Sequence, residues 1–210
     1  MTKIPKFYLH DKKHYKTAED MKYGYGEGVY RLKQLARYAR GKILDVGFAG
    51  RPNPYLKGDV TGLDIVPIKE KPKNYSKTVV ANSQKMPFKE KTFDTIISGD
   101  MIEHIENPSE FLRECYRILK DDGVLIASTP NASFFPLFIF EALFIKKFYF
   151  NDTHINLFSP RIMYKLLRYC RFDLKKMLSG GIYIPRTKIS IRLPATLSQH
   201  IVYISKKIQN

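Results

Sequence analysis

Cysteine is scarce in this sequence. Its 210 residues include two cysteines, Cys115 and Cys170, with no Cys-X-X-Cys pair and no signal-peptide pattern ahead of them. This scarcity argues against a scaffold held by disulfide bonds and against a cysteine-ligated zinc site, and no metal is predicted. Because both cysteines lie in helix-like apolar patterns, we expect buried thiols in a protein of the reducing cytoplasm.

A long uninterrupted apolar run is also missing. The most apolar segment, residues 133–150, contains Pro136, Glu141, Lys146 and Lys147. These residues interrupt it too often for a membrane-spanning helix, so we expect no transmembrane segment. The segment fits an inserted helical lid or a buried helix, and it also fits peripheral contact with a membrane surface. Both alternatives stay open.

Internal repeats and low-complexity tracts are absent as well. Apolar residues make up 44% of the chain and charged residues 27%, which is typical of a globular domain. The length suffices for one α/β domain with a good core and is short for two. We therefore expect a single domain over residues 1–210, with disorder confined to its ends.

Acidic residues are few compared with basic ones. The chain has 20 Asp and Glu against 36 Lys and Arg, which gives a formal net charge of +16. Such a surface attracts polyanions and acidic lipids. The charge is spread from Lys3 to Lys207 without a dense block. It permits RNA as a partner, but no separate RNA-binding module is evident.

Short apolar runs alternate with helical patterns along the chain, as in an α/β protein with a parallel sheet. The expected strands are Lys42–Val46, Val60–Ile65, Lys77–Ala81, Phe93–Ser98 and Val124–Thr129; the expected helices are Glu27–Arg40, Pro108–Lys120 and Ser159–Arg171. The turn Asp121-Asp-Gly123 is expected to end the second of these helices. Two later stretches, Lys188–Arg192 and His200–Ile204, are predicted to form an antiparallel hairpin at the sheet edge.

The first expected strand runs into a glycine-bearing turn. The segment is Ile43-Leu-Asp45-Val-Gly47-Phe-Ala-Gly50, and Asp64 follows Asp45 by 19 residues, at the end of the second strand. A glycine turn lets backbone N–H groups approach a ligand, and an acidic residue ending the next strand can accept both hydroxyls of a ribose. The spacing therefore indicates a nucleotide-type site.

The order of the following motifs resembles the class I S-adenosylmethionine-dependent methyltransferases, particularly their broad small-molecule branch. The resemblance covers about Gly41 to Asn131. The matching segments are Asp45–Gly47, Gly62–Ile65, Ala81–Phe88 with Lys91–Asp94, Ser98–Ile105 and Leu112–Leu125. It implies an α/β, Rossmann-like, doubly wound and mostly parallel seven-stranded sheet with an antiparallel C-terminal hairpin and a helical lid insert.

The resemblance also implies S-adenosylmethionine as the cofactor and places it along the strand ends. In the first motif, Asp45 would belong to the cofactor site, and Gly47 and the backbone of Phe48 would face the methionine part of the cofactor. At the end of the second strand, Asp64 and Ile65 would hold the ribose and flank the adenine.

Two further pairs of residues complete the cofactor site that the resemblance implies. Asn82 and Ser83 would lie at the adenine edge, where the family often has an aspartate in place of Asn82. Gly99 and Asp100, after the fourth strand, would lie near the sulfonium and the methyl acceptor.

The glycine motif departs from the family pattern. Ala49 and Arg51 stand where two more alternating glycines are usual, and Gly50 is off register. We therefore expect the loop to run differently, with Arg51 supplying a positive group near the cofactor carboxylate.

Two histidines are candidates for acid–base chemistry, because imidazole titrates near neutrality and can take a proton from a hydroxyl acceptor. His104 follows Glu103 at the expected start of a helix, and His154 follows the apolar insert. Each is also compatible with a structural role. The insert is where the resembled family usually builds its acceptor pocket, which favours His154.

The predicted function is methyl transfer to a small-molecule or lipid-linked acceptor. The alternatives are an RNA methyltransferase and a non-catalytic relative that acts as a partner or membrane-surface protein. The expected layout is an N-terminal cap over 1–40, a cofactor-binding core over 41–131, an acceptor-pocket insert over 132–160, and a C-terminal helix and hairpin over 161–210.

Overall fold

The computed structural model describes residues 27–136, 139, 143, 154–180, 182–184, 189–191 and 193–209. Most of the expected N-terminal cap and most of the apolar insert lie outside these residues. The described part of the insert is helical at Phe135, Pro136 and Ile139, and the side chain of Phe135 is 70% exposed.

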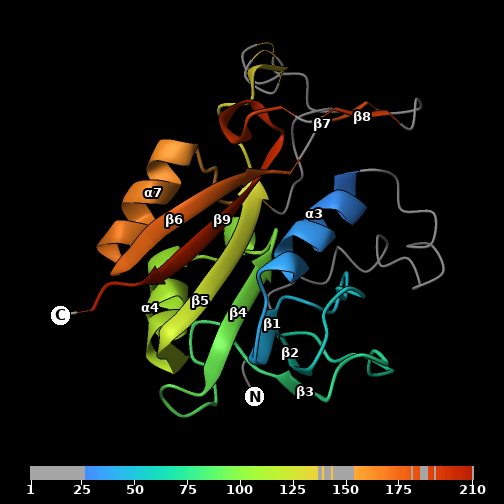
Figure 1. Ribbon diagram of the computed structural model, residues 1–210, viewed down its shortest axis with the longest axis vertical. Coiled ribbons are helices and arrows are strands. Elements are labelled where there is room, and N and C mark those ends of the chain that lie inside the picture. Colours follow the sequence, from blue (N-terminus) through green and yellow to red (C-terminus); the bar gives the residue numbers. More distant parts are fainter. Residues whose placement is uncertain are drawn as a thin grey trace.

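A seven-stranded sheet forms the centre of the molecule (Figure 1). Its order is β3-β2-β1-β4-β5-β9-β6, in which the first five strands run parallel and β9 is antiparallel to both neighbours. The strands are β1 (Lys42–Val46), β2 (Asp59–Asp64), β3 (Lys77–Val80), β4 (Phe93–Gly99), β5 (Leu119–Pro130), β6 (Phe172–Ser179) and β9 (His200–Lys207). This confirms the predicted fold class.

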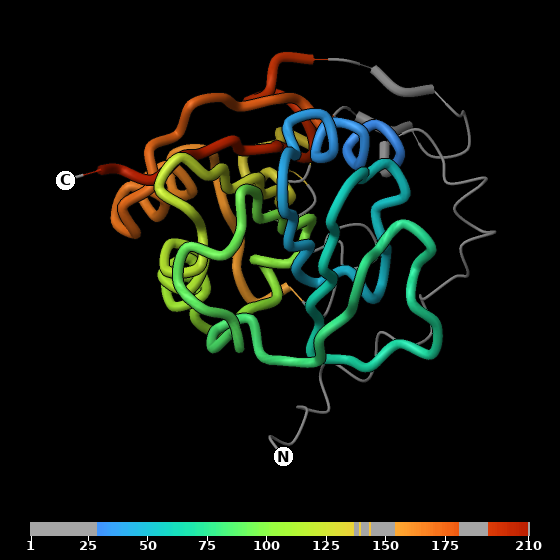
Figure 2. Tube along the Cα trace, turned by 60° about the horizontal axis from the view of Figure 1, so that its bottom comes forward, coloured from blue at the N-terminus to red at the C-terminus, as the bar shows by residue number. Residues whose placement is uncertain are grey.

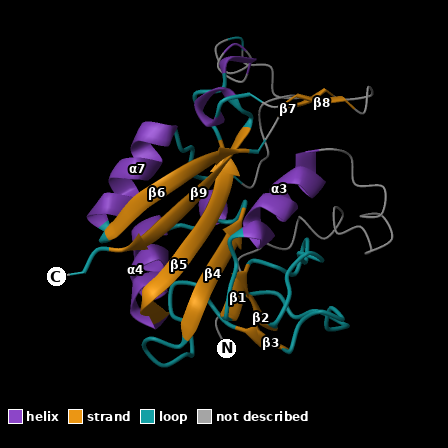
Figure 3. Cartoon of the chain, viewed as in Figure 1, coloured by secondary structure: helices purple, strands orange, loops and turns teal. Residues whose placement is uncertain are grey.

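Helices cover both faces of the sheet, α3 on one and α4 with α7 on the other (Figure 3). The helices are α3 (Glu27–Arg37), α4 (Pro108–Ile118) and α7 (Pro160–Tyr169). Local sequence explains where two of them begin. Asn107 caps α4 and Ser159 caps α7 by accepting a backbone N–H, and each cap is followed by a proline at the first helical position, where the missing N–H costs nothing.

Two apolar cores lie on the two faces, because successive strand residues point to opposite sides. In β4, Ile96 belongs to the core under α4 and α7, whereas Ile97 belongs to the core under α3. Cys115 and Cys170 lie in the first core, as expected, and burial raises the pKa of both thiols. Among the described residues, no helix is long and apolar enough to cross a membrane.

The C-terminal strands pair differently from the prediction. His200–Lys207 is β9, which lies inside the sheet between β5 and β6. Residues Ile189–Ile191 form β8, which pairs with β7 (Ile182–Ile184) in a separate two-stranded sheet. The predicted pairing of 188–192 with 200–204 is therefore wrong, and the antiparallel partner of β9 at the edge is β6.

The junction between α4 and β5 also differs. The helix ends at Ile118, and β5 starts directly at Leu119, so Asp121-Asp122-Gly123 lies within the strand and does not end the helix. An irregularity absorbs these residues, because the register jumps from Phe93↔Leu119 to Thr95↔Val124. Figure 2 shows the two edges of the sheet on opposite sides of the molecule, with residues 50–80 on one side and β6 on the other.

Candidate functional site

The carboxyl ends of β1, β2 and β4 meet at one edge of the sheet, and the turn after β1 lies there. Gly47 has φ +78°, and its N–H donates to the carbonyl of Leu63 at 2.8 Å. A Cβ at this position would lie 2.5 Å from Cγ of Met101. Position 47 therefore requires glycine for both its backbone conformation and its space.

Asp64 closes β2 beside this turn and receives two backbone hydrogen bonds. Its carboxylate accepts from the N–H of Ala49 at 2.9 Å and of Val66 at 3.0 Å. Partial burial raises the pKa of Asp64, and the backbone donors oppose that rise. Since a carboxylate offers about four lone-pair positions, each oxygen can accept a further hydrogen bond. Ile65 follows half-buried.

The turn lacks the alternating glycines, and a backbone hydrogen bond and the packing of Phe48 stabilise it. Its closing hydrogen bond is from the N–H of Arg51 to the carbonyl of Phe48, at 3.0 Å. The Phe48 side chain is buried and packs against the ring of Tyr75. A Cβ on Gly62 would lie 2.7 Å from that phenylalanine ring, so the glycine of β2 makes space for Phe48. Of these residues, Phe48 and Arg51 line the pocket described below.

Asp45 lies at the back of the turn. The hydroxyl of Tyr75 donates to its carboxylate and accepts from the N–H of Asn53. Burial raises the pKa of Asp45 to about 7, although the hydrogen bond from Tyr75 acts in the opposite direction. The Asn53 side chain in turn donates to the carbonyl of Leu32 at 3.0 Å. This network fastens the loop after β1 to α3.

The end of β3 lies against the end of β2. The N–H of Ala81 donates to the carbonyl of Asp64 at 2.9 Å, which brings the next two residues, Asn82 and Ser83, to the same edge. Asn82 is exposed, and its side chain accepts from the N–H of Gln84 at 2.8 Å. Ser83 is half-buried.

Gly99 ends β4 and Asp100 follows it, on the other side of the turn. Asp100 has φ +49° and forms an ion pair with Arg31 of α3 at 3.0 Å. It also accepts from the Ser128 hydroxyl at 2.7 Å and lies 3.2 Å from His200. Burial acts to raise the pKa of Asp100, but the charges of Arg31 and His200 and these hydrogen bonds outweigh it and lower the pKa.

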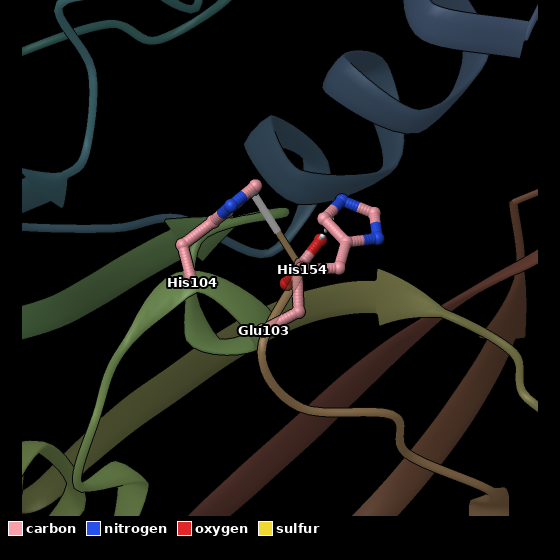
Figure 4. Close-up of side chains that lie close together, drawn as sticks. All are labelled: Glu103, His104 and His154. Carbon is pink, nitrogen blue, oxygen red and sulfur yellow. Dashed lines mark ion pairs between the residues drawn. The ribbon is translucent and has the colours of Figure 1, made fainter. Parts of the chain in front are cut away.

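The short 3₁₀ turn Ile102–His104 comes next, so His104 ends this turn and does not start a helix. Its ring lies edge-on to that of His154, with centroids 4.7 Å apart. Nε2 of His154 lies 4.0 Å from Oε1 of Glu103 (Figure 4). The Glu103 side chain is 1% exposed, and burial, with the nearby charge of Asp100, raises its pKa to about 8.

A pocket is present at the ends of β1 and β4. It lies between α3 and the turn after β1, and Gly99 forms part of its wall. The lining residues are Arg31, Leu32, Leu35, Asp45, Val46, Gly47, Phe48, Arg51, Asn53, Ile97 and Gly99. Hence four of the nine residues predicted for the cofactor line the pocket, namely Asp45, Gly47, Phe48 and Gly99. The other five predicted residues, Asp64, Ile65, Asn82, Ser83 and Asp100, are not among its lining residues.

Sequence reasoning missed several residues of this site. Arg31 is 4% exposed, although arginine is seldom buried without a partner. The signal available was its position four residues before Leu35, on the apolar face of an amphipathic helix. Tyr75, Ser128 and His200 carry no comparable signal, because their partners are distant in sequence.

Comparison with known proteins assigns the family. A family model described as a methyltransferase domain matches residues 44–127. A ubiquinone biosynthesis O-methyltransferase of Pseudomonas entomophila is 34% identical over 170 residues, covering 79% of this chain and 68% of that protein. The chain belongs to the class I S-adenosylmethionine-dependent methyltransferases. This confirms the resemblance seen in the sequence, including the enzyme class and the cofactor of the family.

Solved structures agree on the fold. A SAM-dependent methyltransferase from Thermotoga maritima has a TM-score of 0.70 at 18% identity, covering 96% of this chain and 97% of that one. A Burkholderia thailandensis 1,6-didemethyltoxoflavin-N1-methyltransferase, solved with 1,6-didemethyltoxoflavin and S-adenosylhomocysteine, has a TM-score of 0.63 at 15% identity, covering 96% and 86%. The chain spans 19% to 42% of the length of several other curated relatives.

Proposed function

We propose that this chain transfers the methyl group of S-adenosylmethionine to an oxygen atom of a small-molecule or lipid-linked acceptor. The observation that carries the proposal is the cradle at the strand ends. There the turn at Gly47 has no room for a side chain, and the carboxylate of Asp64 is held by two backbone N–H groups beside it.

The residues fit the cofactor. The lone pairs of Asp64 that face away from Ala49 and Val66 suit the two hydroxyls of a ribose. The exposed Asn82 suits the polar edge of an adenine. Arg51 at the pocket supplies a positive group for a carboxylate. S-adenosylmethionine supplies a methyl group already activated by a positive sulfur, so the chain's residues chiefly bind and align the reactants.

The choice of acceptor is supported by the relatives. The Pseudomonas entomophila relative is named an O-methyltransferase of ubiquinone biosynthesis, which favours an oxygen acceptor. The Burkholderia thailandensis neighbour holds a small ring-bearing molecule. His104 and His154 remain the predicted acceptors of a hydroxyl proton, and the contact between their rings just after β4 is compatible with that role.

Calorimetric titration with S-adenosylhomocysteine tests the cofactor part of the proposal. We expect saturable one-to-one binding by the wild-type protein. Asp64→Ala should weaken it at least about tenfold, because two hydrogen bonds to a charged acceptor are lost. Asp59→Ala is the matched control, since Asp59 is an exposed aspartate at the opposite end of the same strand.

Binding to neither S-adenosylhomocysteine nor S-adenosylmethionine would contradict the proposal and favour the non-catalytic alternative. Equal affinity in Asp64→Ala and Asp59→Ala would remove the cradle as the binding site. With binding established, hydroxyl-bearing and amine-bearing ring compounds offered with radiolabelled S-adenosylmethionine test the acceptor atom. Label transferred only to amines would contradict the oxygen assignment.

A further inference from the structure

Three potential metal ligands meet at the turn after β4. Glu103 and His104 belong to the turn after β4, and His154 belongs to the segment that follows the insert. Each offers one ligand atom, and these atoms all lie within 4.8 Å of one another. Figure 4 shows the three side chains pointing toward one another. His154 follows His104 by 50 residues, so sequence spacing gives no sign of the cluster.

The carboxylate of Glu103 lacks a hydrogen-bond donor. Both oxygens are buried, and neither accepts a hydrogen bond from any residue that the structure describes. Its closest ion-pair partner, Nε2 of His154, lies 4.0 Å away, which is beyond hydrogen-bond range. A buried carboxylate without a donor is costly and rare in folded proteins. A bound cation between the oxygens and the imidazole rings would remove that cost.

The donor set selects the kind of cation. Mg²⁺ and Ca²⁺ prefer sites built from oxygen atoms alone. Two imidazole nitrogens with one carboxylate oxygen are typical ligands of Zn²⁺ and of related divalent transition metals. We propose that Glu103, His104 and His154 form a binding site for a divalent transition metal ion of the zinc type.

The backbone holds the two segments of the site together. The N–H groups of Ile155 and Asn156 both donate to the carbonyl of Glu103 at 3.0 Å. The side-chain amide of Asn156 donates to the carbonyl of Ile105 at 2.6 Å. The residue that carries the second imidazole is therefore anchored next to the turn that carries the other two ligands. Tetrahedral zinc bonds of about 2.1 Å place their ligand atoms closer together than the 4.8 Å within which these three lie, so metal binding would draw the three side chains inward.

A site with three protein ligands keeps at least one coordination position for another molecule, the arrangement of catalytic and not of structural zinc. The turn that carries two of the ligands also contacts the cofactor cradle, since Met101 lies against Gly47. This inference gives the two histidines a role different from proton transfer, because a nitrogen that binds the metal cannot take a proton. It goes beyond the proposed methyl transfer and does not require it.

The test is metal binding by the purified, chelator-treated protein. We expect one equivalent of Zn²⁺ in calorimetry, and Co²⁺ should give the visible absorption bands of a four- or five-coordinate site. Glu103→Gln and His154→Ala should each weaken binding by at least about tenfold, since even residues behind the ligands typically contribute 10- to 100-fold. Glu106→Gln is the matched control, because it makes the same chemical change at an exposed position on the same loop.

Loss of binding in Glu103→Gln and His154→Ala, with retention in Glu106→Gln, supports the site. Failure of the wild-type protein to bind Zn²⁺ or Co²⁺ saturably overturns it, as does unchanged affinity in Glu103→Gln. If one variant does not fold, the other decides. S-adenosylhomocysteine binding by the same preparations is an independent readout. A protein that binds S-adenosylhomocysteine but no metal refutes the metal site alone, and one that binds metal but no S-adenosylhomocysteine refutes the proposed function alone.

Discussion

The two halves of the candidate site are built in different ways. At the ends of β1, β2 and β3, backbone hydrogen bonds hold the site together. Examples are the turn at Gly47 and the two N–H groups that donate to Asp64. At the carboxyl ends of β4 and β5 and the start of β9, charged side chains from distant segments meet. An example is the network of Arg31, Asp100 and His200.

The difference affects both stability and function. A backbone-built cradle is sensitive to changes of volume, because main-chain geometry fixes its space. A side-chain-built pocket is sensitive to the loss of a charge, because each buried charge depends on its partner. Near the expected acceptor, the stability of the site therefore depends most strongly on keeping every charged side chain of the network.

Removing the guanidinium of Arg31 should have the largest effect. Arg31→Met keeps the apolar stem but leaves the half-buried Asp100 without its guanidinium partner. Breaking a fully buried pair typically costs about 3–5 kcal/mol, and we expect a loss somewhat below this range because the Asp100 side chain is 20% exposed. Urea unfolding measures the loss. The double variant Arg31→Met with Asp100→Asn should recover part of the lost stability, because it also removes the unpaired carboxylate. The control is Lys91→Met, which breaks an exposed ion pair with Asp121 and should change stability little. An equal loss of stability in Arg31→Met and Lys91→Met would contradict the distinction between the two kinds of ion pair.

Adding one methyl group to the cradle should come next. In Gly47→Ala the new Cβ meets Met101, whereas in Gly58→Ala, with φ +97°, the nearest atom is 3.7 Å away. Both variants suffer backbone strain, so their difference isolates the clash. We expect Gly47→Ala to be less stable than Gly58→Ala by about 1–3 kcal/mol and to lose binding of S-adenosylhomocysteine. Equal stability and equal binding would show that the turn can move.

The buried carboxyl of Asp45 should make stability depend on pH. Its pKa is about 7 in the folded protein against a usual value of 3.8. The folded state therefore keeps a proton that the unfolded state loses near pH 4, so this group's contribution to stability falls as pH rises from about 4 to about 7. The slope is at most about 1.4 kcal/mol per pH unit.

Asp45→Asn provides the comparison for that slope. Asparagine does not titrate and still offers an oxygen to the hydroxyl of Tyr75. The free energy of unfolding of wild type minus variant should decrease between pH 4 and 7 and then level off. A constant difference over this range would mean that Asp45 ionises normally in the folded protein. The paired measurement removes the effect of Asp100, whose pKa is shifted downward.

The smallest effect is expected at the adenine edge. Asn82→Asp restores the residue that the resembled family often has there, and its carboxylate can still accept the N–H of Gln84. A charged acceptor should tighten S-adenosylhomocysteine binding by up to about tenfold. Gln84→Glu places the same charge two residues along and should not. Equal changes in the two variants would indicate a general electrostatic effect.

Local sequence predicted the cradle better than the pocket. Gly47 and Asp64 were found because a parallel strand, a glycine turn and an acidic residue follow one another at fixed spacing. The C-terminal pairing was predicted wrongly, because a short apolar run does not specify its partner. Between β5 and the sheet edge, β9 pairs with both β5 and β6, and β6 is an edge strand in which Lys175, Lys176 and Met177 are exposed. Such a strand lacks the apolar run that marks a buried one.

The sequence alone therefore determined the family resemblance, the succession of the parallel strands along the chain and the glycine turn after the first of them, since each depends on residues close together in the chain. Only the tertiary structure decided that Arg31 lies against Asp100, that His200 approaches the same carboxylate, and that His154 meets Glu103 and His104. These contacts join segments that the sheet topology brings together. Burial then shifts the pKa values of these groups and makes an unpaired charge costly. No local sequence pattern reveals which residues will be buried together.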